Sequence, residues 1–295
     1  MRNDAFSGYH PAINFLYFVL TIGCAMVLTH PVCLVLSLTC ALGYSFALLG
    51  RRAVRLYMLP LLLVTTIANP LFSHAGVTTL AYLPSGNPLT LESILYGIWA
   101  AFLLATVITW FSCFNAVMSG DKLVYLFGRA VPALSLVLSM ALRFVPRFTA
   151  QAKAIADAQK CLGRGVSDGN VFRRAKHGIK ILSILVTWAL ENAIDTADSM
   201  KSRGYGLPGR SAFSIYRFEK RDKLALLFLA VCGGLVIAGT FMGQLEFHFY
   251  PSIGYADFSA WQAGLFTIYF ALCGLPLWAR GREALQWRRA LPAET

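Results

Sequence analysis

Two short segments of the chain share the pattern Ala-Asp-x-x-Lys-x-x-Gly, namely Ala156–Gly163 and, later in the sequence, Ala197–Gly204. Glycine commonly follows the last residue of a helix, so both segments are predicted to be helix ends. The match indicates one function present twice. Coincidence within so short a window is the alternative.

Arginine is the residue at these ends with the most distinctive chemistry. Arg203 precedes Gly204, whereas the first segment has Leu162 at the matching position and Arg164-Gly165 two residues later. A guanidinium has five fixed donors that suit carboxylates or backbone carbonyls, and it keeps its charge when partly buried. An arginine at such a helix end is therefore suited to binding a partner. For Arg143 and Arg147, a solvated or lipid-facing charge, or an internal ion pair, is an equal alternative.

The chain carries no recognisable catalytic motif. It lacks G-x-x-x-x-G-K-[ST], H-E-x-x-H and C-x-x-C, and no Ser/His/Asp set is apparent. The cysteines lie mostly in or beside apolar runs, as small buried hydrophobes do. His30, His74 and His248 are too scattered to suggest a metal site. We therefore predict no catalytic residue, no metal and no cofactor.

Two long helices must position the paired ends. The first is predicted from about Ala133 to Lys160, with a kink at Pro146, and the second from about Val171 to Ser202. Alanines four residues apart share one face of each helix, so the two faces could form a close crossing. These alanines are Ala150, Ala154 and Ala158 in the first helix and Ala189, Ala193 and Ala197 in the second. Alternatively, alanine is simply a good helix former.

The rest of the chain has the composition of a membrane protein. Hydrophobic residues make up 57% and charged residues 14%, against about 25% charged in soluble domains. Apolar runs long enough to cross a bilayer occur six times, and Arg55, near the start of the third, is the charged residue within them. The runs are Ala12–Leu28, Val32–Leu49, Val54–Phe72, Ile94–Phe114, Leu224–Met242 and Phe258–Ala279. The predicted fold is an all-α polytopic membrane protein with about six spans and two long crossing cytoplasmic helices.

The distribution of positive charge predicts the topology. Lys and Arg are confined to the N-terminus, the loop at Arg51–Arg55, the segment Lys122–Lys223 and the tail from Arg280. The positive-inside rule places these four regions, which include both termini, on the cytoplasmic side of the membrane. The chain is therefore predicted to be a multi-pass protein of the cell membrane. Contact with anionic lipid explains the net charge of +12 better than nucleic acid does, so no nucleic-acid partner is predicted.

The basic central segment is not predicted to cross the membrane. Its apolar stretches, Val131–Leu142 and Ile179–Leu190, are too short to span and favour helices at the cytoplasmic membrane face. The chain thus divides into transmembrane residues 1–118, a cytoplasmic segment 119–222 and a transmembrane part 223–295.

Several motifs resemble the transmembrane T component of energy-coupling factor (ECF) transporters, which are ABC-type importers of vitamins and transition-metal ions. They are Ala141–Arg147, Ala158–Lys160, Ser202–Tyr205 and the pair His10-Pro11. The resemblance covers nearly the whole chain and is most specific in the central segment.

This resemblance implies a non-catalytic scaffold that joins two ABC-type ATPases to a substrate-binding membrane S component. In the family, each of two crossing coupling helices ends in an Ala-Arg-Gly-like motif that docks on one ATPase. The corresponding residues are Ser202, Arg203 and Gly204 at the second end and Gly163, Arg164 and Gly165 at the first. Either the first helix is extended to reach Arg164, or it docks without the usual arginine.

Two other functions remain open at this point. One is a permease subunit of a conventional ABC importer, which would bind substrate without an S component. The other is a membrane-embedded lipid-modifying enzyme, which would need a polar catalytic cluster at a span end. Apart from Arg55 near the start of the third run, the predicted spans contain no Lys, Arg, Asp, Glu or His, which argues against an ion-coupled permease.

Overall fold

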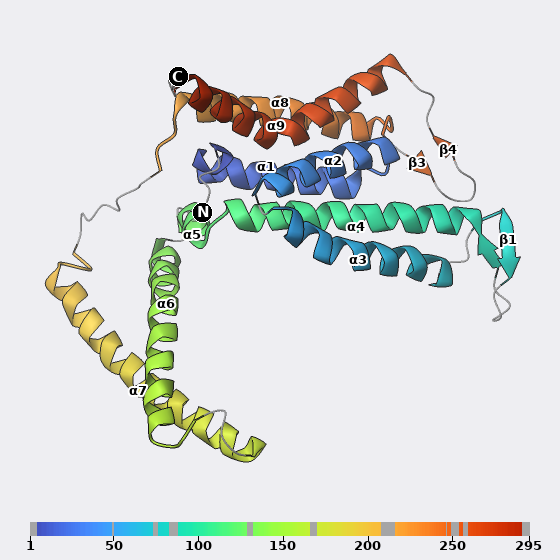
Figure 1. Ribbon diagram of the computed structural model, residues 1–295. Coiled ribbons are helices and arrows are strands. Elements are labelled where there is room, and N and C mark those ends of the chain that lie inside the picture. The colour runs from blue at the N-terminus through green and yellow to red at the C-terminus, as the bar shows by residue number, and fades with distance from the viewer. Residues whose placement is uncertain are drawn as a thin grey trace, which may run out of the picture. The chain divides into compact units, whose positions relative to one another are not determined.

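Nearly all of the described chain is helical (Figure 1). The computed structural model describes residues 5–48, 50–72, 76–82, 88–128, 132–165, 170–207, 216–245, 247–248, 254–255 and 259–290. The chain forms two compact units, unit 1 from Met1–Ser119 and Tyr216–Thr295, and unit 2 from Gly120–Ile215.

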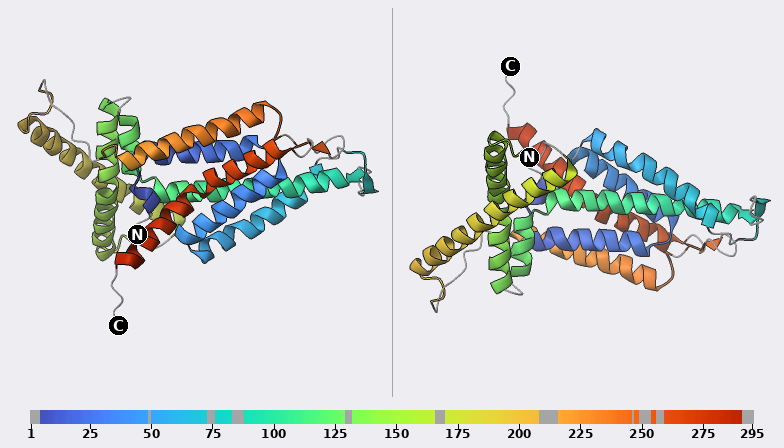
Figure 2. Two further views of the ribbon diagram at one scale, coloured as in Figure 1. Left: turned by 90° about the horizontal axis from the view of Figure 1, so that it is seen from above. Right: turned by 90° about the horizontal axis from the view of Figure 1, so that it is seen from below.

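Unit 1 contains the apolar helices. They are α1 (Pro11–Val27), α2 (Pro31–Leu48), α3 (Arg51–Phe72), α4 (Leu91–Val117), α8 (Lys220–Phe241) and α9 (Ala260–Ala290), preceded by a 3-10 turn, η1 (Ala5–Gly8). Helix α4 packs on α1, α2 and α3, and α9 packs on α2, α8 and η1 (Figure 2). Unit 2 consists of α5 (Gly120–Gly128), α6 (Pro132–Cys161) and α7 (Val171–Ser202), with α6 packed against both α5 and α7.

Within the described residues, each of the six predicted apolar runs falls on one of the unit 1 helices and extends past it by no more than two residues at either end, and the predicted all-α fold is confirmed. Leu49 and Phe258, each at one end of a run, lie outside the described residues. Among the described residues, four helices are long and apolar enough to cross a bilayer: α2, α4, α8 and residues Ala260–Gln286 of α9. Helix α1 is equally apolar but has 17 residues, and α3 begins at Arg51-Arg52. The number of six crossings remains a prediction.

Two features differ from the sequence prediction. Short antiparallel hairpins pair β1 (Thr79–Tyr82) with β2 (Pro88–Thr90) and β3 (Phe247–His248) with β4 (Gly254–Tyr255), although only helices were expected. Helix α9 also continues far beyond Ala279. A hydropathy pattern identifies only the apolar part of a helix. The helix itself can continue into a polar sequence, because its backbone hydrogen bonds do not depend on apolar side chains.

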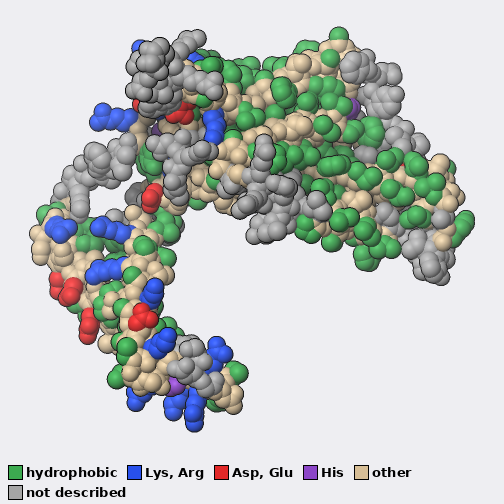
Figure 3. Space-filling model, viewed as in Figure 1, with side chains coloured by type: hydrophobic (Ala, Val, Ile, Leu, Met, Phe, Trp, Pro, Cys, Tyr) green, Lys and Arg blue, Asp and Glu red, His purple; other side chains and the backbone are tan. Residues whose placement is uncertain are grey.

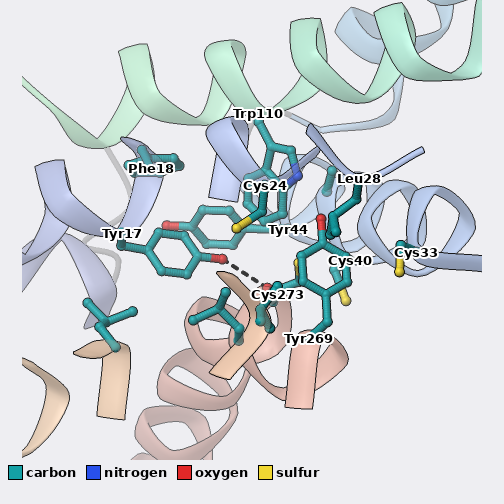
Figure 4. Close-up of a cluster of buried hydrophobic side chains, with 14 of the residues drawn as sticks. Tyr17, Phe18, Cys24, Leu28, Cys33, Cys40, Tyr44, Trp110, Tyr269 and Cys273 are labelled. Atoms are coloured by element: carbon teal, nitrogen blue, oxygen red, sulfur yellow. Dashed lines mark hydrogen bonds between the residues drawn. The ribbon is translucent and has the colours of Figure 1, made fainter. Parts of the chain in front are cut away.

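The core of unit 1 is built from aromatic rings and small thiols (Figure 4). Tyr17 of α1 donates its hydroxyl to the carbonyl of Cys273 in α9, at 2.9 Å. Trp110 of α4 donates its indole N–H to Ser37 Oγ of α2, at 3.0 Å. A buried tyrosine hydroxyl or indole N–H needs a hydrogen-bond acceptor. Each of these two bonds also joins two helices.

Helices α1 and α2 begin in the same way. His10 precedes Pro11, and its Nδ1 accepts a hydrogen bond from the Ala12 amide at 3.2 Å. His30 precedes Pro31, and its Nδ1 accepts from the Val32 amide at 3.3 Å. Proline suits the first helical position because its missing N–H would have no partner there, and the histidine serves as the cap.

Candidate functional site

The end of α6 is closed by a specific pattern of backbone hydrogen bonds. Gly163 lies in the left-handed region with φ +69°. Its amide donates to the carbonyl of Lys160 at 3.0 Å, and the Arg164 amide donates to the carbonyl of Gln159 at 2.9 Å. This pair of bonds around a left-handed glycine is the Schellman motif, which satisfies carbonyls that the helix leaves unpaired.

The end of α7 has the same closure. Gly204 has φ +79°. Its amide donates to the carbonyl of Lys201 at 2.9 Å, and the Tyr205 amide donates to the carbonyl of Met200 at 3.0 Å. The repeated sequence pattern therefore corresponds to a repeated local structure.

The hydrogen bonds fix which residues correspond at the two ends. Gly163 matches Gly204, so Leu162 occupies the position of Arg203, and Arg164 occupies the position of Tyr205. Helix α6 ends at Cys161. The first helix is therefore not extended to bring Arg164 into the place of Arg203.

The side chains at both ends are available to a partner. Arg203, Arg164 and Leu162 are exposed, and Leu162 exposes 66% of its surface. Ser202 is also exposed, and its hydroxyl donates to the carbonyl of Asp198 at 2.9 Å. Gly165, in contrast, is buried. The two ends share one backbone shape, but the exposed residue before the left-handed glycine is apolar at the first end (Leu162) and cationic at the second (Arg203).

Helices α6 and α7 cross near their middles, as predicted (Figures 1 and 2). Arg147 Nη2 donates to Asn192 Oδ1 at 2.9 Å. The Arg147 guanidinium also lies 5.5 Å from the ring centroid of Trp188, and Phe148 meets the same ring edge-on at 5.6 Å. One arginine thus joins an amide and an aromatic face of the opposite helix.

The alanines proposed for the crossing lie elsewhere on the helix surfaces. Ala189 is partly buried, and the other five are exposed: Ala150, Ala154, Ala158, Ala193 and Ala197. On α6 the buried residue near this region is Ile155. The structure brings the helices together, but its described ring and polar contacts are made by larger side chains.

Sequence reasoning did not identify the contacts of Arg147. It considered solvent, lipid or an ion pair for this residue, whereas the partners are an amide and an indole. The available signal was the pair Phe144 and Phe148, whose i, i+4 spacing places two rings on one face beside Arg147. These two rings stack at 5.7 Å.

Helix α7 carries a long unpartnered apolar stripe. It has no buried residue. The spacing of the stripe is that of one helix face, and its members are Ile179, Leu182, Val186, Leu190 and Ile194, each between 49% and 68% exposed. Lys and Arg side chains are concentrated over α6 and α7, while the visible face of the apolar unit is mostly hydrophobic (Figure 3).

The comparisons with known proteins identify this arrangement. The model of the family "CbiQ: Cobalt transport protein" matches residues 9–215, which is well over half of the chain. The chain belongs to the CbiQ family. The matched range includes both Schellman ends and the crossing of α6 and α7.

Curated relatives of this CbiQ-family chain are named energy-coupling factor transporter transmembrane protein EcfT. The relative from Leuconostoc gelidum is 32% identical over 60% of this chain and 69% of its own length. Bacillus selenitireducens has one that is 27% identical over 71% of this chain and 84% of its own. With the Lactobacillus helveticus protein the identity is 36%, over 39% of this chain and only 42% of the relative. The predicted resemblance is confirmed: this is a membrane protein of the ECF T-component type.

Proposed function

We propose that this chain is the non-catalytic coupling subunit of an ECF importer, transmitting movement from two ABC-type ATPases to a membrane S component that binds the substrate. The substrate class is a vitamin or a transition-metal ion. The basic regions and both termini lie on the cytoplasmic side of the cell membrane.

The observation that carries this proposal is the pair of equivalent helix ends. Two partners of similar shape, such as two ATPase subunits, require two similar surfaces on the subunit that joins them. The second end offers Ser202, Arg203 and Gly204, with the exposed guanidinium beside the turn. The first end offers Gly163 and Arg164, followed by Gly165. Its position equivalent to Arg203 holds Leu162, so this end docks through an apolar contact there.

The apolar stripe of α7 supports the membrane side of the proposal. An exposed apolar face of this length on a unit of three helices needs a cover of lipid or of another membrane protein. We assign it to the S component and the adjoining lipid. Arg147 and Trp188 hold the point at which α6 and α7 cross.

Replacing Arg203 by Glu tests the docking role. The variant should no longer copurify with the ATPases, or it should assemble but hydrolyse ATP without substrate uptake, because a carboxylate repels the acceptors that a guanidinium binds. Arg203→Lys should retain part of the function. Lys176→Glu makes the same charge change at an exposed position near the start of α7, away from this helix end, and should leave assembly unchanged.

Normal assembly and uptake by the Arg203→Glu complex would refute the role of this residue. Substrate binding needs a separate test. The chain should bind no substrate when it is purified without an S component, and tight binding in that form would instead indicate a conventional ABC permease.

A further inference from the structure

The start of α8 is bonded directly to the start of α1, although these segments are far apart in the sequence. Asp222 is 2% exposed. One of its carboxylate oxygens accepts from the His10 amide at 3.3 Å, and the other accepts from the Glu219 amide at 3.0 Å. The second bond is the side-chain half of a capping box at α8. A single buried carboxylate therefore closes one helix and holds another.

Arg221 adds a second set of contacts between the same segments. Its Nη2 donates to the carbonyl of Gly8 at 3.0 Å. The guanidinium lies 5.4 Å from the ring centroid of Tyr9 and forms an ion pair with Glu219, Nε to Oε2, at 2.9 Å. The planar guanidinium can make these contacts together, which an ammonium cannot do.

The N-terminal partner of these residues is itself firmly held. Phe6 of η1 is fully buried, with its ring 5.0 Å from that of Tyr17 and 6.3 Å from that of Tyr44. The His10 ring packs against Phe218 at 4.8 Å. The segment that receives Asp222 and Arg221 is therefore anchored in the aromatic core of unit 1.

We propose that Asp222 and Arg221 form a latch that fixes the returning end of the cytoplasmic segment to the N-terminus of α1, and that this latch is required for coupling. The inference rests on the proposed function. Residues 120–215 join unit 1 at Tyr216, within a few residues of Asp222. Movement of the coupling helices can pass along the chain into α8 through this junction, and a frayed helix start there would absorb the displacement through its own backbone.

Asp222 and Arg221 are positioning residues in this scheme. They touch neither substrate nor nucleotide, and they act by keeping α1 and α8 in one register. The pair His10-Pro11 is part of the family resemblance in the sequence, which implies no role for it. The spacing Glu219-x-x-Asp222 was the available signal, since an acid at the third helical position commonly closes a capping box.

Hydrogen exchange on the purified chain tests the latch without reference to transport. In Asp222→Ala the His10 and Glu219 amides should exchange about ten- to hundredfold faster, because each loses a bond to a charged acceptor. Asp222→Asn keeps one oxygen acceptor and should show a smaller increase. Lys220→Ala, at an exposed neighbouring position, is the matched control. Unchanged exchange in Asp222→Ala would overturn the latch.

Transport assays on the complex, with the ATPases and S component copurified, test its role in coupling. Arg221→Ala and Asp222→Asn should assemble and hydrolyse ATP at near-normal rates while uptake falls about tenfold or more. Arg221→Lys should recover uptake partly. Full uptake by both variants would overturn the coupling role. If the unmodified chain assembles with no ATPase at all, the proposed function fails, while the exchange result still decides whether the latch exists.

Discussion

Leu162 and Arg203 show how one backbone motif can carry two different side chains at the cap position. The left-handed glycine that follows each of them sets the direction in which the chain leaves the helix. The residue before that glycine is free to vary, because its side chain makes none of the capping bonds. Shape at these ends is therefore determined by Gly163 and Gly204, and binding chemistry by their neighbours.

Substitution of these glycines by alanine should weaken both helix ends. A left-handed conformation costs a residue with a Cβ about 1–2 kcal/mol. At Gly204 the added Cβ would also lie 3.1 Å from the Leu207 Cδ1, whereas Gly163 has open space. Faster amide exchange at Arg164 in Gly163→Ala, and at Tyr205 in Gly204→Ala, measures the effect.

Gly178→Ala is a control in which alanine should raise the stability of the helix rather than lower it. Gly178 lies inside α7, it is not among the glycines with positive φ, and it has open space around it. Gly178→Ala should stabilise the helix by about 0.5–1 kcal/mol. If all three alanine variants behaved alike, the glycine closures would not be the reason for the effect.

His30 should make the stability of the α1–α2 connection depend on pH. Partial burial lowers the pKa of His30 below its usual value of about 6.5. The unfolded chain then binds the proton more readily, so stability is present above about pH 6.5 and is lost as the pH falls below it. Protonation also removes the Nδ1 acceptor for Val32.

The thermal unfolding midpoint, followed between about pH 7.5 and 5, checks this dependence. His30→Asn is the matched variant, because asparagine can cap the helix with its side-chain oxygen but does not titrate. It should show a smaller loss of stability on acidification. The same slope in both proteins would contradict the assignment to His30.

At the scale of elements, the crossing of α6 and α7 depends on a small set of side chains. Removing both Arg147 and Trp188 should be less costly than the sum of the single changes, by about 0.5–1 kcal/mol, because the two residues stabilise the crossing jointly. A double-mutant cycle of alanine variants measures this coupling. The pair Arg143 and Trp188 is the control and should give a value near zero.

The sequence predicted these elements better than their contacts. Val171–Ser202 matched α7 at both ends, because an asparagine cap precedes Val171 and a glycine follows shortly after Ser202. Periodicity also placed the alanines correctly on one face of each helix. It could not show which face meets the other helix, since that choice depends on larger side chains distant in sequence, such as Phe148 and Trp188.

Pro146 lies inside α6, and the helix continues through it to Cys161. The kink expected at Pro146 stays a prediction, whereas the hairpins illustrate a further limit. Strands of two to four residues, such as those of β1 and β3, contain too few positions for an alternating pattern to stand out. The latch was not predicted for a different reason. Asp222 accepts a hydrogen bond from His10, which lies near the other end of the chain, and local sequence patterns do not reveal such distant partners.

For the whole molecule, Cys161 offers a direct test of topology. All seven cysteines lie in the part of the chain that the structure describes, and Cys161 is the exposed one among them. If the end of α6 is cytoplasmic, a membrane-impermeant maleimide should label Cys161 in inside-out vesicles and not in intact cells. Cys161→Ser should abolish the signal.

Val77→Cys in the Cys161→Ser chain is the reciprocal control. Val77 precedes β1 and is 71% exposed. It lies between the predicted spans Val54–Phe72 and Ile94–Phe114, in a loop without Lys or Arg, which the positive-inside rule predicts to be external. This variant should be labelled in intact cells. Labelling of both positions from the same side would contradict the predicted arrangement of the spans.

The open apolar stripe of α7 also has a consequence for the life of the protein in a cell. A copy made in excess of its partners would present that stripe, from Ile179 to Ile194, to chaperones and proteases. We expect such orphan copies to be degraded faster than assembled ones. The abundance of this subunit would then follow the supply of its partners, and the number of complete transporters would be limited by whichever component is scarcest.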